Sequence, residues 1–157
     1  MREEYFFFLS GQLEPTNQAY AIAKIAGIQM CYSYRTQYGD NFISPLPCNL
    51  YGPGDHYNDE KSHVLAALIS KFHQAKTEEK DFVTIWGSGS PRREFLFVAD
   101  LCEAILFLLE NYNSSDIINV GPGVDITIKE LATVVSKTVG FSGELKYDTN
   151  KPDGCTR

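Results

Sequence analysis

The chain has 157 residues, of which 43% are hydrophobic, 13% aromatic and 22% charged. This composition is close to average globular usage, so collagen-like, low-complexity and strongly disordered chains are excluded. Lysine and arginine number 14 against 20 aspartates and glutamates, a net charge of -6, and the basic residues are scattered. We therefore expect no nucleic-acid partner, which would need a basic face, whereas a few well-placed cations could still bind a phosphate.

The sequence shows few features that would direct the protein to a particular compartment. Two acids precede the five-residue apolar run Tyr5–Leu9, which is too short for a secretory leader, and no stretch approaches the roughly 18 apolar residues of a membrane helix. The cysteines form no C-x-x-C pair and have no histidine at metal-ligand spacing. We expect a cytoplasmic protein with no membrane association, no metal site and four reduced thiols, at Cys31, Cys48, Cys102 and Cys155.

Helical patterns alternate with short β-branched runs along the chain. Alanines and isoleucines recur at helical spacing over 17–38, with Thr16 or Asn17 as N-cap and Gly39 as the stop. Residues 42–50 follow as a strand candidate, but Pro45 and Pro47 argue against its full pairing. Further helices are expected from Ser62, as the cap, to about 75 and over 100–111, and further strands over 82–86, 94–98, 117–120 and 144–147.

The last helix has the clearest boundaries. Thr127 and Glu130 form a T-x-x-E capping box at its start, and Gly140 should end it. Strands separated by helices predict an α/β protein with at least part of its sheet parallel. The first fifteen residues contain one glycine and no Gly-rich phosphate-binding turn, and Gly87-Ser88-Gly89 is expected to be a turn between strands.

Tyr20 and Lys24 are four residues apart in the first helix and therefore lie on one face of it. An ammonium beside a tyrosine hydroxyl favours the phenolate, so such a pair can exchange a proton with a sugar carbonyl or hydroxyl. The same spacing occurs in Tyr57/Lys61 and Tyr147/Lys151, outside clear helices. Spacing alone leaves two interpretations open, a catalytic pair and a solvated pair on a helix surface.

The segment LEPTNQAYAIAKIAG, residues 13–27, resembles the active-site helix of the GDP-L-fucose synthase family, which belongs to the extended short-chain dehydrogenases/reductases. Two of the blocks given below, NLYGP and REFL, also occur in other nucleotide-sugar epimerases and dehydratases. The helix together with the SHV block is specific for the GDP-L-fucose synthase family. Matching blocks follow in family order nearly to the end of the chain: NLYGP at 49–53, SHV at 62–64, WGSG at 86–89, REFL at 93–96, INVG at 118–121 and KPDG at 151–154.

The resemblance implies an NADP(H)-dependent enzyme that epimerises GDP-4-keto-6-deoxy-D-mannose at C3 and C5 and reduces its C4 ketone, giving GDP-L-fucose. Tyr20 would protonate the C4 oxygen, while Lys24 would tune it and hold the nicotinamide ribose. His63 would be the acid in epimerisation, because imidazole can donate a proton at neutral pH to a carbanion stabilised as an enolate. The family also implies a homodimer.

Binding residues follow from the same resemblance. Lys71 stands where many family members have arginine, and a lysine neutralises a diphosphate without forming a bidentate fork, so weaker substrate binding is expected. The implied cofactor-binding residues are Lys24, Pro47, Cys48, Asn49, Leu50 and His63, and the implied GDP-sugar residues are Lys71, Trp86, Arg93 and Asp153.

The implied fold is the C-terminal part of a Rossmann-type NAD(P)-binding domain with a small α/β substrate domain. Residues 1–54 would belong to the cofactor-binding domain and 55–157 mainly to substrate binding, with some return elements to the Rossmann part. Family members are roughly twice as long, and their N-terminal half supplies the Gly-rich loop, a catalytic serine and the cysteine proposed as base. Residues 1–157 match none of these three features, so we expect the chain to be inactive alone.

Two alternatives stay open at this stage. The chain could be part of another nucleotide-sugar epimerase or dehydratase, which would prefer UDP- or dTDP-sugars. It could also be a non-catalytic sugar-nucleotide-binding or dimerisation paralogue, which would associate with a full-length enzyme and show no hydride transfer.

Overall fold

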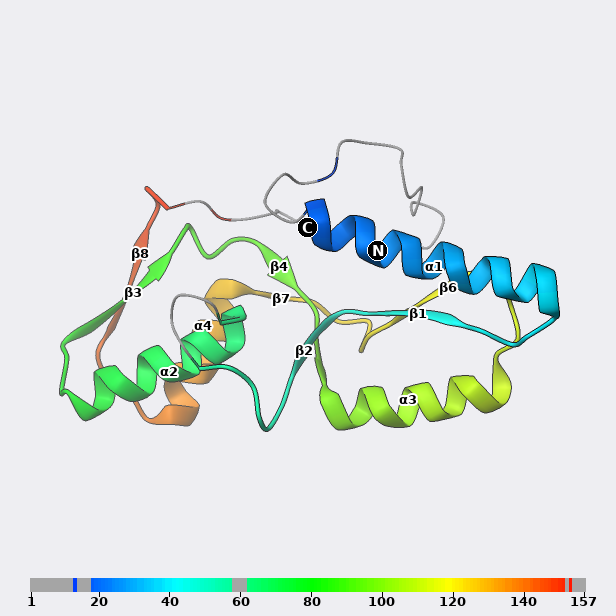
Figure 1. Cartoon of the computed structure of the whole chain (residues 1–157). Helices are drawn as coiled ribbons and strands as arrows, with labels where there is room; N and C mark the ends of the chain where they lie inside the picture. Colours follow the sequence, from blue (N-terminus) through cyan, green and yellow to red (C-terminus); the bar gives the residue numbers. More distant parts are fainter. Residues whose placement is uncertain (1–12, 14–17, 58–61, 152, 154–157) are drawn as a thin grey trace. The chain divides into compact units, whose positions relative to one another are not determined.

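The computed structural model describes residues 13, 18–57, 62–151 and 153. They form two compact units: unit 1 is Met1–Cys48 with Ala99–Val120, and unit 2 is Asn49–Val98 with Gly121–Arg157. The elements in chain order (Figure 1) are α1 (Gln18–Tyr38), β1 (Ser44–Pro47), β2 (Asn49–Tyr51), α2 (Val64–Thr77), β3 (Phe82–Trp86), β4 (Arg92–Arg93), β5 (Phe95–Phe97), α3 (Val98–Asn111), β6 (Ile117–Val120), β7 (Ile126–Thr127), α4 (Ile128–Val139) and β8 (Glu144–Asp148).

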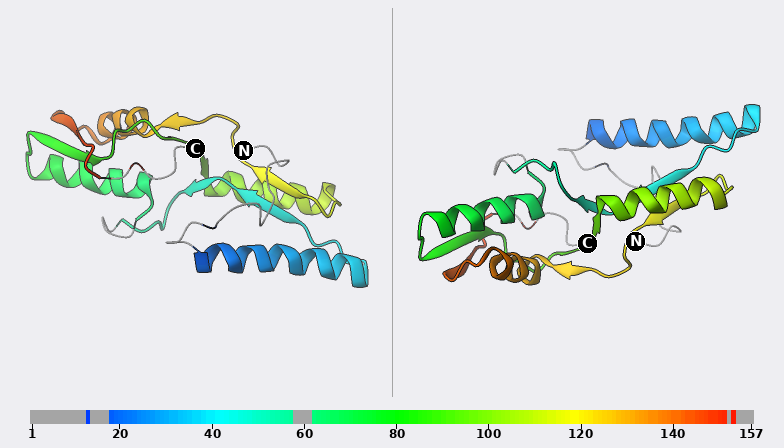
Figure 2. Two further views of the ribbon diagram at one scale, coloured as in Figure 1. Left: turned by 90° about the horizontal axis from the view of Figure 1, so that it is seen from above. Right: turned by 90° about the horizontal axis from the view of Figure 1, so that it is seen from below.

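Unit 1 is built on the parallel strand pair β1–β6, in which Ser44 is opposite Ile117 and Pro47 is opposite Val120. The pair runs between α1 and α3 (Figures 1 and 2). Helix α1 ends as expected, because Gly39 has φ +76 and its amide donates to the Arg35 carbonyl at 3.0 Å. The expected caps, Thr16 and Asn17, lie outside the described residues.

The edge of β1 that faces away from β6 carries two prolines. The Cys48 amide donates to the Val120 carbonyl at 3.0 Å. Successive residues of a strand bond to alternate sides, so Leu46 faces β6, and Pro45 and Pro47 face the opposite edge. Among the described residues β1 has β6 as its strand partner, and the prolines therefore lie on an open edge, where a missing N–H breaks no ladder.

Unit 2 holds the hydrophobic core. Helix α2 packs against α4 and against strand β3, which pairs in parallel with β8 from Phe82/Glu144 to Trp86/Asp148. Phe72 is fully buried, and its ring lies 5.6 Å from that of Phe141. The nine buried residues of this cluster are Leu68, Phe72, Ala75, Val83, Ile85, Leu131, Ala132, Val135 and Phe141.

The capping box of α4 is confirmed. The Glu130 amide donates to Thr127 Oγ1 at 3.0 Å, and the Thr127 amide donates to Glu130 Oε2 at 2.9 Å. The Thr127 hydroxyl also donates to Glu130 Oε2 at 2.7 Å. This bond first, then the bond from the Thr127 amide and the nearby charge of Arg92, hold the pKa of Glu130 below its ordinary value. At the other end Gly140 takes the left-handed conformation with φ 77, as expected for a helix stop.

The α/β class with parallel pairing is confirmed: β1–β6, β2–β5 and β3–β8 are parallel, and β4–β7 is antiparallel. Three boundary predictions are wrong. His63, extended with φ -63 and ψ 152, is the N-cap of α2 in place of Ser62. Helix α3 begins at Val98 rather than Asp100, which shortens the preceding strand. The strand expected over 42–50 divides at Cys48, because β1 pairs with β6 and β2 pairs with β5.

Candidate functional site

Tyr20 and Lys24 lie together on the first turns of α1, as their spacing predicts. Lys24 Nζ lies 5.4 Å from the centroid of the Tyr20 ring, and the Tyr20 side chain is 66% exposed. The phenol is therefore accessible to a ligand and has an ammonium beside it. The two side chains can present a hydroxyl and a cation to the same molecule, which a proton-transfer pair requires.

His63 is exposed and precedes α2, where its carbonyl accepts from the Ala67 amide at 2.9 Å. The imidazole makes no capping hydrogen bond to the helix, so the His63 side chain does not serve as a cap of α2. An exposed ring at a helix start can reach a ligand, and this position is compatible with the acid role that the resemblance implies.

The segment from Pro47 to Leu50 crosses from unit 1 to unit 2. The Cys48 backbone is bonded to β6, and Asn49 Nδ2 donates to the Glu94 carbonyl at 2.9 Å. Pro47 and Asn49 are exposed, whereas Cys48 and Leu50 are partly buried. The amide side chain of Asn49 thus links β2 to the residue that lies between β4 and β5, in addition to any role toward a ligand.

Trp86 is the centre of a group of polar side chains in unit 2. Its ring is 62% exposed, and two ammonium groups approach the ring centroid, Lys71 Nζ at 5.7 Å and Lys151 Nζ at 5.4 Å. Lys71 reaches from α2 and donates to the Thr84 carbonyl at 3.1 Å, which fixes its position. Such an arrangement suits a ligand that carries both a flat ring and an anionic group. The flat ring can stack on the exposed indole, and the two ammonium groups can neutralise the anion.

The turn after Trp86 is closed by Asp153. The Ser88 amide donates to Asp153 Oδ1 at 2.6 Å, and Ser88 Oγ donates to Oδ2 at 2.8 Å. Gly87 has φ +79, and a Cβ there would lie 2.2 Å from Asp153 Oδ1, so only glycine fits. The expected turn is confirmed, and the anion that its amide holds is the chain's own carboxylate. We call Lys71, Trp86, Ser88, Lys151 and Asp153 the Trp86 cluster.

The cluster lies where β3 and β8 end. Trp86 is the last residue of β3, Asp148 is the last of β8, and the Gly87 amide donates to the Asp148 carbonyl at 2.9 Å. Ligands of open parallel sheets bind outside the carboxyl ends of the strands. Of the four residues assigned to the GDP-sugar, Lys71, Trp86 and Asp153 come together here. Arg93 lies on β4, where its Nη1 donates to the Arg92 carbonyl at 2.7 Å.

Two members of the cluster were not expected from the sequence. Lys151 belongs to the matched KPDG block, yet the cation of that block was not assigned a role, and Ser88 was assigned only to a turn. Their partners are distant in sequence: Ser88 and Asp153 are 65 positions apart. A signal was available for Lys151, because a lysine beside an assigned aspartate on an otherwise acidic chain is a candidate for anion binding.

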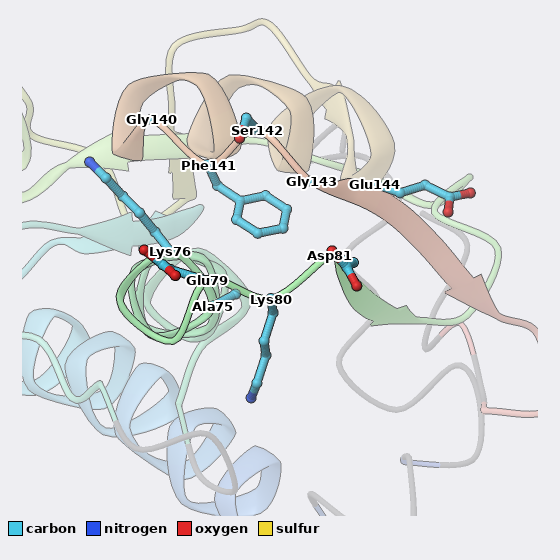
Figure 3. Close-up of a pocket in the computed structure, with 10 residues that line it drawn as sticks. All are labelled: Ala75, Lys76, Glu79, Lys80, Asp81, Gly140, Phe141, Ser142, Gly143 and Glu144. Carbon is cyan, nitrogen blue, oxygen red and sulfur yellow. The ribbon is translucent and has the colours of Figure 1, made fainter.

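The opposite ends of β3 and β8 hold a cavity of about 490 Å³, lined by residues around Lys76, Lys80, Asp81, Phe141 and Glu144 (Figure 3). Its cations already have partners. Lys76 Nζ donates to the Val139 carbonyl at 2.8 Å, and Lys80 Nζ lies 2.6 Å from Glu78 Oε2. The Phe141 ring points toward α2 and belongs to the core (Figure 3). This cavity is less suited to an anionic ligand than the Trp86 cluster.

Metal-binding clusters and membrane-spanning helices are not found in the described part of the chain. No group of three or more metal-ligating side chains lies there, and no helix there is long and apolar enough to cross a membrane. Cys31 and Cys102 are free thiols, and Cys155 lies outside the described residues.

Comparison with known proteins identifies the family. The model of the NAD dependent epimerase/dehydratase family matches residues 6–121. The chain belongs to this family. The curated relatives include "Probable GDP-L-fucose synthase 1" of Oryza sativa subsp. japonica, 55% identical over 95% of this chain, and "GDP-L-fucose synthase" of Sinorhizobium fredii, 52% identical over 100% of it.

The chain spans about half the length of these relatives, 45% of the rice protein and 49% of the bacterial one, and it matches their C-terminal half. Among solved structures, a GDP-L-fucose synthetase from Naegleria fowleri bound to NADP has a TM-score of 0.88 and 29% identity over 99% of this chain and 50% of its own. The resemblance drawn from the sequence blocks and the fold class are therefore confirmed.

Proposed function

We propose that this chain supplies the sugar-nucleotide site and part of the cofactor site of a GDP-L-fucose synthase. The whole enzyme would use NADPH to epimerise and reduce GDP-4-keto-6-deoxy-D-mannose to GDP-L-fucose. The observation that carries the proposal is the Trp86 cluster, in which Lys71 and Lys151 flank an exposed aromatic ring at the carboxyl ends of two parallel strands. The names of the curated relatives support GDP-L-fucose as the product.

In the sugar-nucleotide site, Lys71 and Lys151 would neutralise the diphosphate, and the Trp86 ring would stack on a flat or apolar face of the ligand. Base–aromatic stacking contributes about 1–3 kcal/mol, and a hydrogen bond to a charged group about 1.5–3 kcal/mol. Asp153 would act indirectly by holding the turn that follows Trp86, through its two hydrogen bonds to Ser88.

The residues of α1 fit the nicotinamide end of NADP(H). Lys24 offers an ammonium that can donate to ribose hydroxyls, and the exposed Tyr20 hydroxyl lies on the same face. When bound, NADPH supplies a hydride to C4 of the sugar. Tyr20 would donate its proton to the O4 oxygen as negative charge develops there, and Lys24 would favour the resulting phenolate. Pro47, Cys48, Asn49 and Leu50 would line this part of the site.

In the epimerisation step, His63 would donate a proton to the carbon of an enolate intermediate. The base that removes the first proton, and the Gly-rich turn for the cofactor phosphates, have no counterpart in the sequence of residues 1–157. Losing one positioned proton-transfer group lowers a rate by about 10²- to 10⁴-fold. We therefore expect no measurable turnover when the purified chain is mixed with NADPH and the keto-sugar nucleotide, and substantial turnover would contradict this expectation.

Calorimetric titration with GDP tests the sugar-nucleotide site without requiring catalysis. We expect GDP to bind, and Lys71→Ala and Trp86→Ala each to weaken binding about tenfold, which corresponds to about 1.4 kcal/mol. Lys80→Ala is the matched control, because that ammonium lies at the opposite strand ends beside Glu78. Equal loss with Lys80→Ala would contradict the assignment.

The same titration separates the alternative functions. Tighter binding of UDP or dTDP than of GDP would favour another nucleotide-sugar epimerase or dehydratase.

The homodimer and the cytoplasmic location implied by the resemblance stay predictions, and light scattering of the purified chain checks the first of them. Co-purification with a full-length enzyme, without any hydride transfer by the complex, would favour the non-catalytic paralogue.

A further inference from the structure

Arg93, which the resemblance assigns to the GDP-sugar, lies on a very short strand. Strand β4 consists of Arg92 and Arg93 alone, and it pairs in antiparallel with β7, where Arg92 is opposite Thr127 and Arg93 is opposite Ile126. Two short strands by themselves are marginally stable at best. The position of Arg93 therefore depends on contacts other than this ladder.

Arg92 supplies such contacts through its side chain. Its Nε donates to Asp125 Oδ1 at 2.8 Å, and its Nη2 donates to the Asp125 carbonyl at 3.0 Å. The rigid guanidinium thus holds the side chain and the backbone of one residue at the same time. The Asp125 side chain is only 21% exposed, so solvent screens this ion pair less than a pair on the open surface. We call these two hydrogen bonds the Asp125 clamp.

The same guanidinium also connects β4 to helix α4. Asp125 immediately precedes β7, and Arg92 Nη1 lies 3.9 Å from Glu130 Oε2. That carboxylate oxygen accepts from the amide and the hydroxyl of Thr127 in the capping box. Helix α4 in turn contributes buried side chains to the core of unit 2. Arg92 therefore ties a two-residue strand to the element that carries part of this core.

The main chain of Arg92 holds the side chain of Arg93. Arg93 Nη1 donates to the Arg92 carbonyl at 2.7 Å. Because a guanidinium is planar, a hydrogen bond at one of its nitrogens restricts the directions of its other N–H groups, and such groups bind phosphate oxygens in pairs. The Asp125 clamp fixes the backbone of Arg92, and the carbonyl of that residue then orients the Arg93 guanidinium.

We propose that Arg92 is a positioning residue of the sugar-nucleotide site, which holds the Arg93 guanidinium in the orientation that the diphosphate of a GDP-sugar requires. The inference rests on the proposed function and adds a residue to it, because Arg92 precedes the REFL block and the resemblance gives it no role. A purely structural Arg92 would stabilise unit 2 without acting through Arg93, and the two roles predict different binding data.

A double-mutant cycle separates these roles. GDP is titrated calorimetrically into the unchanged chain, Arg92→Ala, Arg93→Ala and the double variant. We expect Arg93→Ala to weaken GDP binding about tenfold and Arg92→Ala about fivefold, and the double variant to bind GDP as weakly as Arg93→Ala alone. Lys146→Ala is the matched control and should bind GDP like the unchanged chain. It also removes one cation from a strand of unit 2, but that ammonium lies 3.9 Å from the Phe82 ring centroid and 3.6 Å from Glu144 Oε2.

Arg92→Lys keeps the proposal testable if Arg92→Ala fails to fold, which the fluorescence of Trp86 would report. A lysine leaves a cation beside Asp125 but has no planar fork. We expect Arg92→Lys to weaken GDP binding about twofold in the unchanged chain and to have no further effect in the Arg93→Ala variant.

Each outcome decides the proposal. A loss of affinity with the Arg92 variants that disappears in the Arg93→Ala background supports it. The same loss in both backgrounds, an equal loss with Lys146→Ala, or no loss with either arginine variant overturns it and leaves the proposed function in place. An unchanged chain that does not bind GDP overturns the proposed function and this inference together, so binding by the unchanged chain distinguishes the two failures.

Discussion

Units 1 and 2 differ in how much of their apolar surface they bury themselves. The cluster around Phe72 lies wholly in unit 2, whereas the buried hydrophobic residues among the described part of unit 1 are Leu101 and Leu108 of α3. Unit 1 nevertheless contains the longest described helix, the 21-residue α1. A helical pattern therefore does not ensure a core, because most helix stability in proteins comes from tertiary packing. Unit 2 is expected to be the stable part of the chain.

The largest expected effect is that of Phe72→Ala. Removal of this fully buried ring leaves a cavity beside Phe141 and should lower the free energy of unfolding by about 3–5 kcal/mol. Trp86 is the single tryptophan of the chain, so its fluorescence during denaturant unfolding reports on unit 2. The exposed neighbour His73→Ala should change stability by less than about 0.5 kcal/mol. Equal effects of the two variants would mean that the Phe72 cluster does not determine the stability of unit 2.

A smaller effect is expected at Gly87. Gly87→Ala adds a Cβ to a residue whose backbone is left-handed, which should lower the free energy of unfolding by about 1–2 kcal/mol. The same Cβ displaces the Asp153 carboxylate, which should lower it by about 1 kcal/mol more. Gly54→Ala is the control, because Gly54 has φ +85 but an added Cβ would meet no atom of the described residues within 4 Å. Only Gly87→Ala should also weaken GDP binding. Equal losses of stability and affinity in both variants would contradict a role for Asp153 in holding the turn.

The smallest effect concerns the capping box of α4. The pKa of Glu130 is lowered in the folded state, chiefly by the hydrogen bond from the Thr127 side chain. Its contribution to stability is therefore present above the ordinary value of 4.5 and is lost as the pH falls below 4.5 through the lower folded pKa. Glu130→Gln should remove this part of the pH dependence of unfolding. An unchanged pH profile of unfolding, followed by Trp86 fluorescence, would contradict the assignment.

The elements that depend on local sequence were predictable. The capping box at Thr127, the stop at Gly140 and strand β3 are set by neighbouring residues, and all three are confirmed. The predicted starts of helices α2 and α3 were wrong by one or two residues. The conformations of His63 and Val98 depend on the folded chain rather than on their sequence neighbours alone. The two-residue ladder between β4 and β7 has too little sequence for a periodic pattern.

The candidate site was predictable in its residue types and less so in its contacts. The resemblance assigns Lys71, Trp86 and Asp153 to the GDP-sugar, and the structure brings these three side chains together at one end of β3. Lys151 and the contact between Ser88 and Asp153 could not be derived from spacing, because they arise when the last strand β8 pairs with β3. The pairing of strands that are distant in sequence decides which side chains meet. The local sequence pattern does not specify this pairing.

The prolines of β1 also affect how this chain can aggregate. Edge-to-edge polymerisation requires each edge to offer N–H donors and carbonyl acceptors in alternation. At the edge of β1 that has no partner strand among the described residues, Pro45 and Pro47 offer carbonyl acceptors without the two corresponding donors. Two copies brought together at this edge would oppose acceptor to acceptor. The strand can thus remain open to a complementary donor strand while resisting self-templated fibril growth.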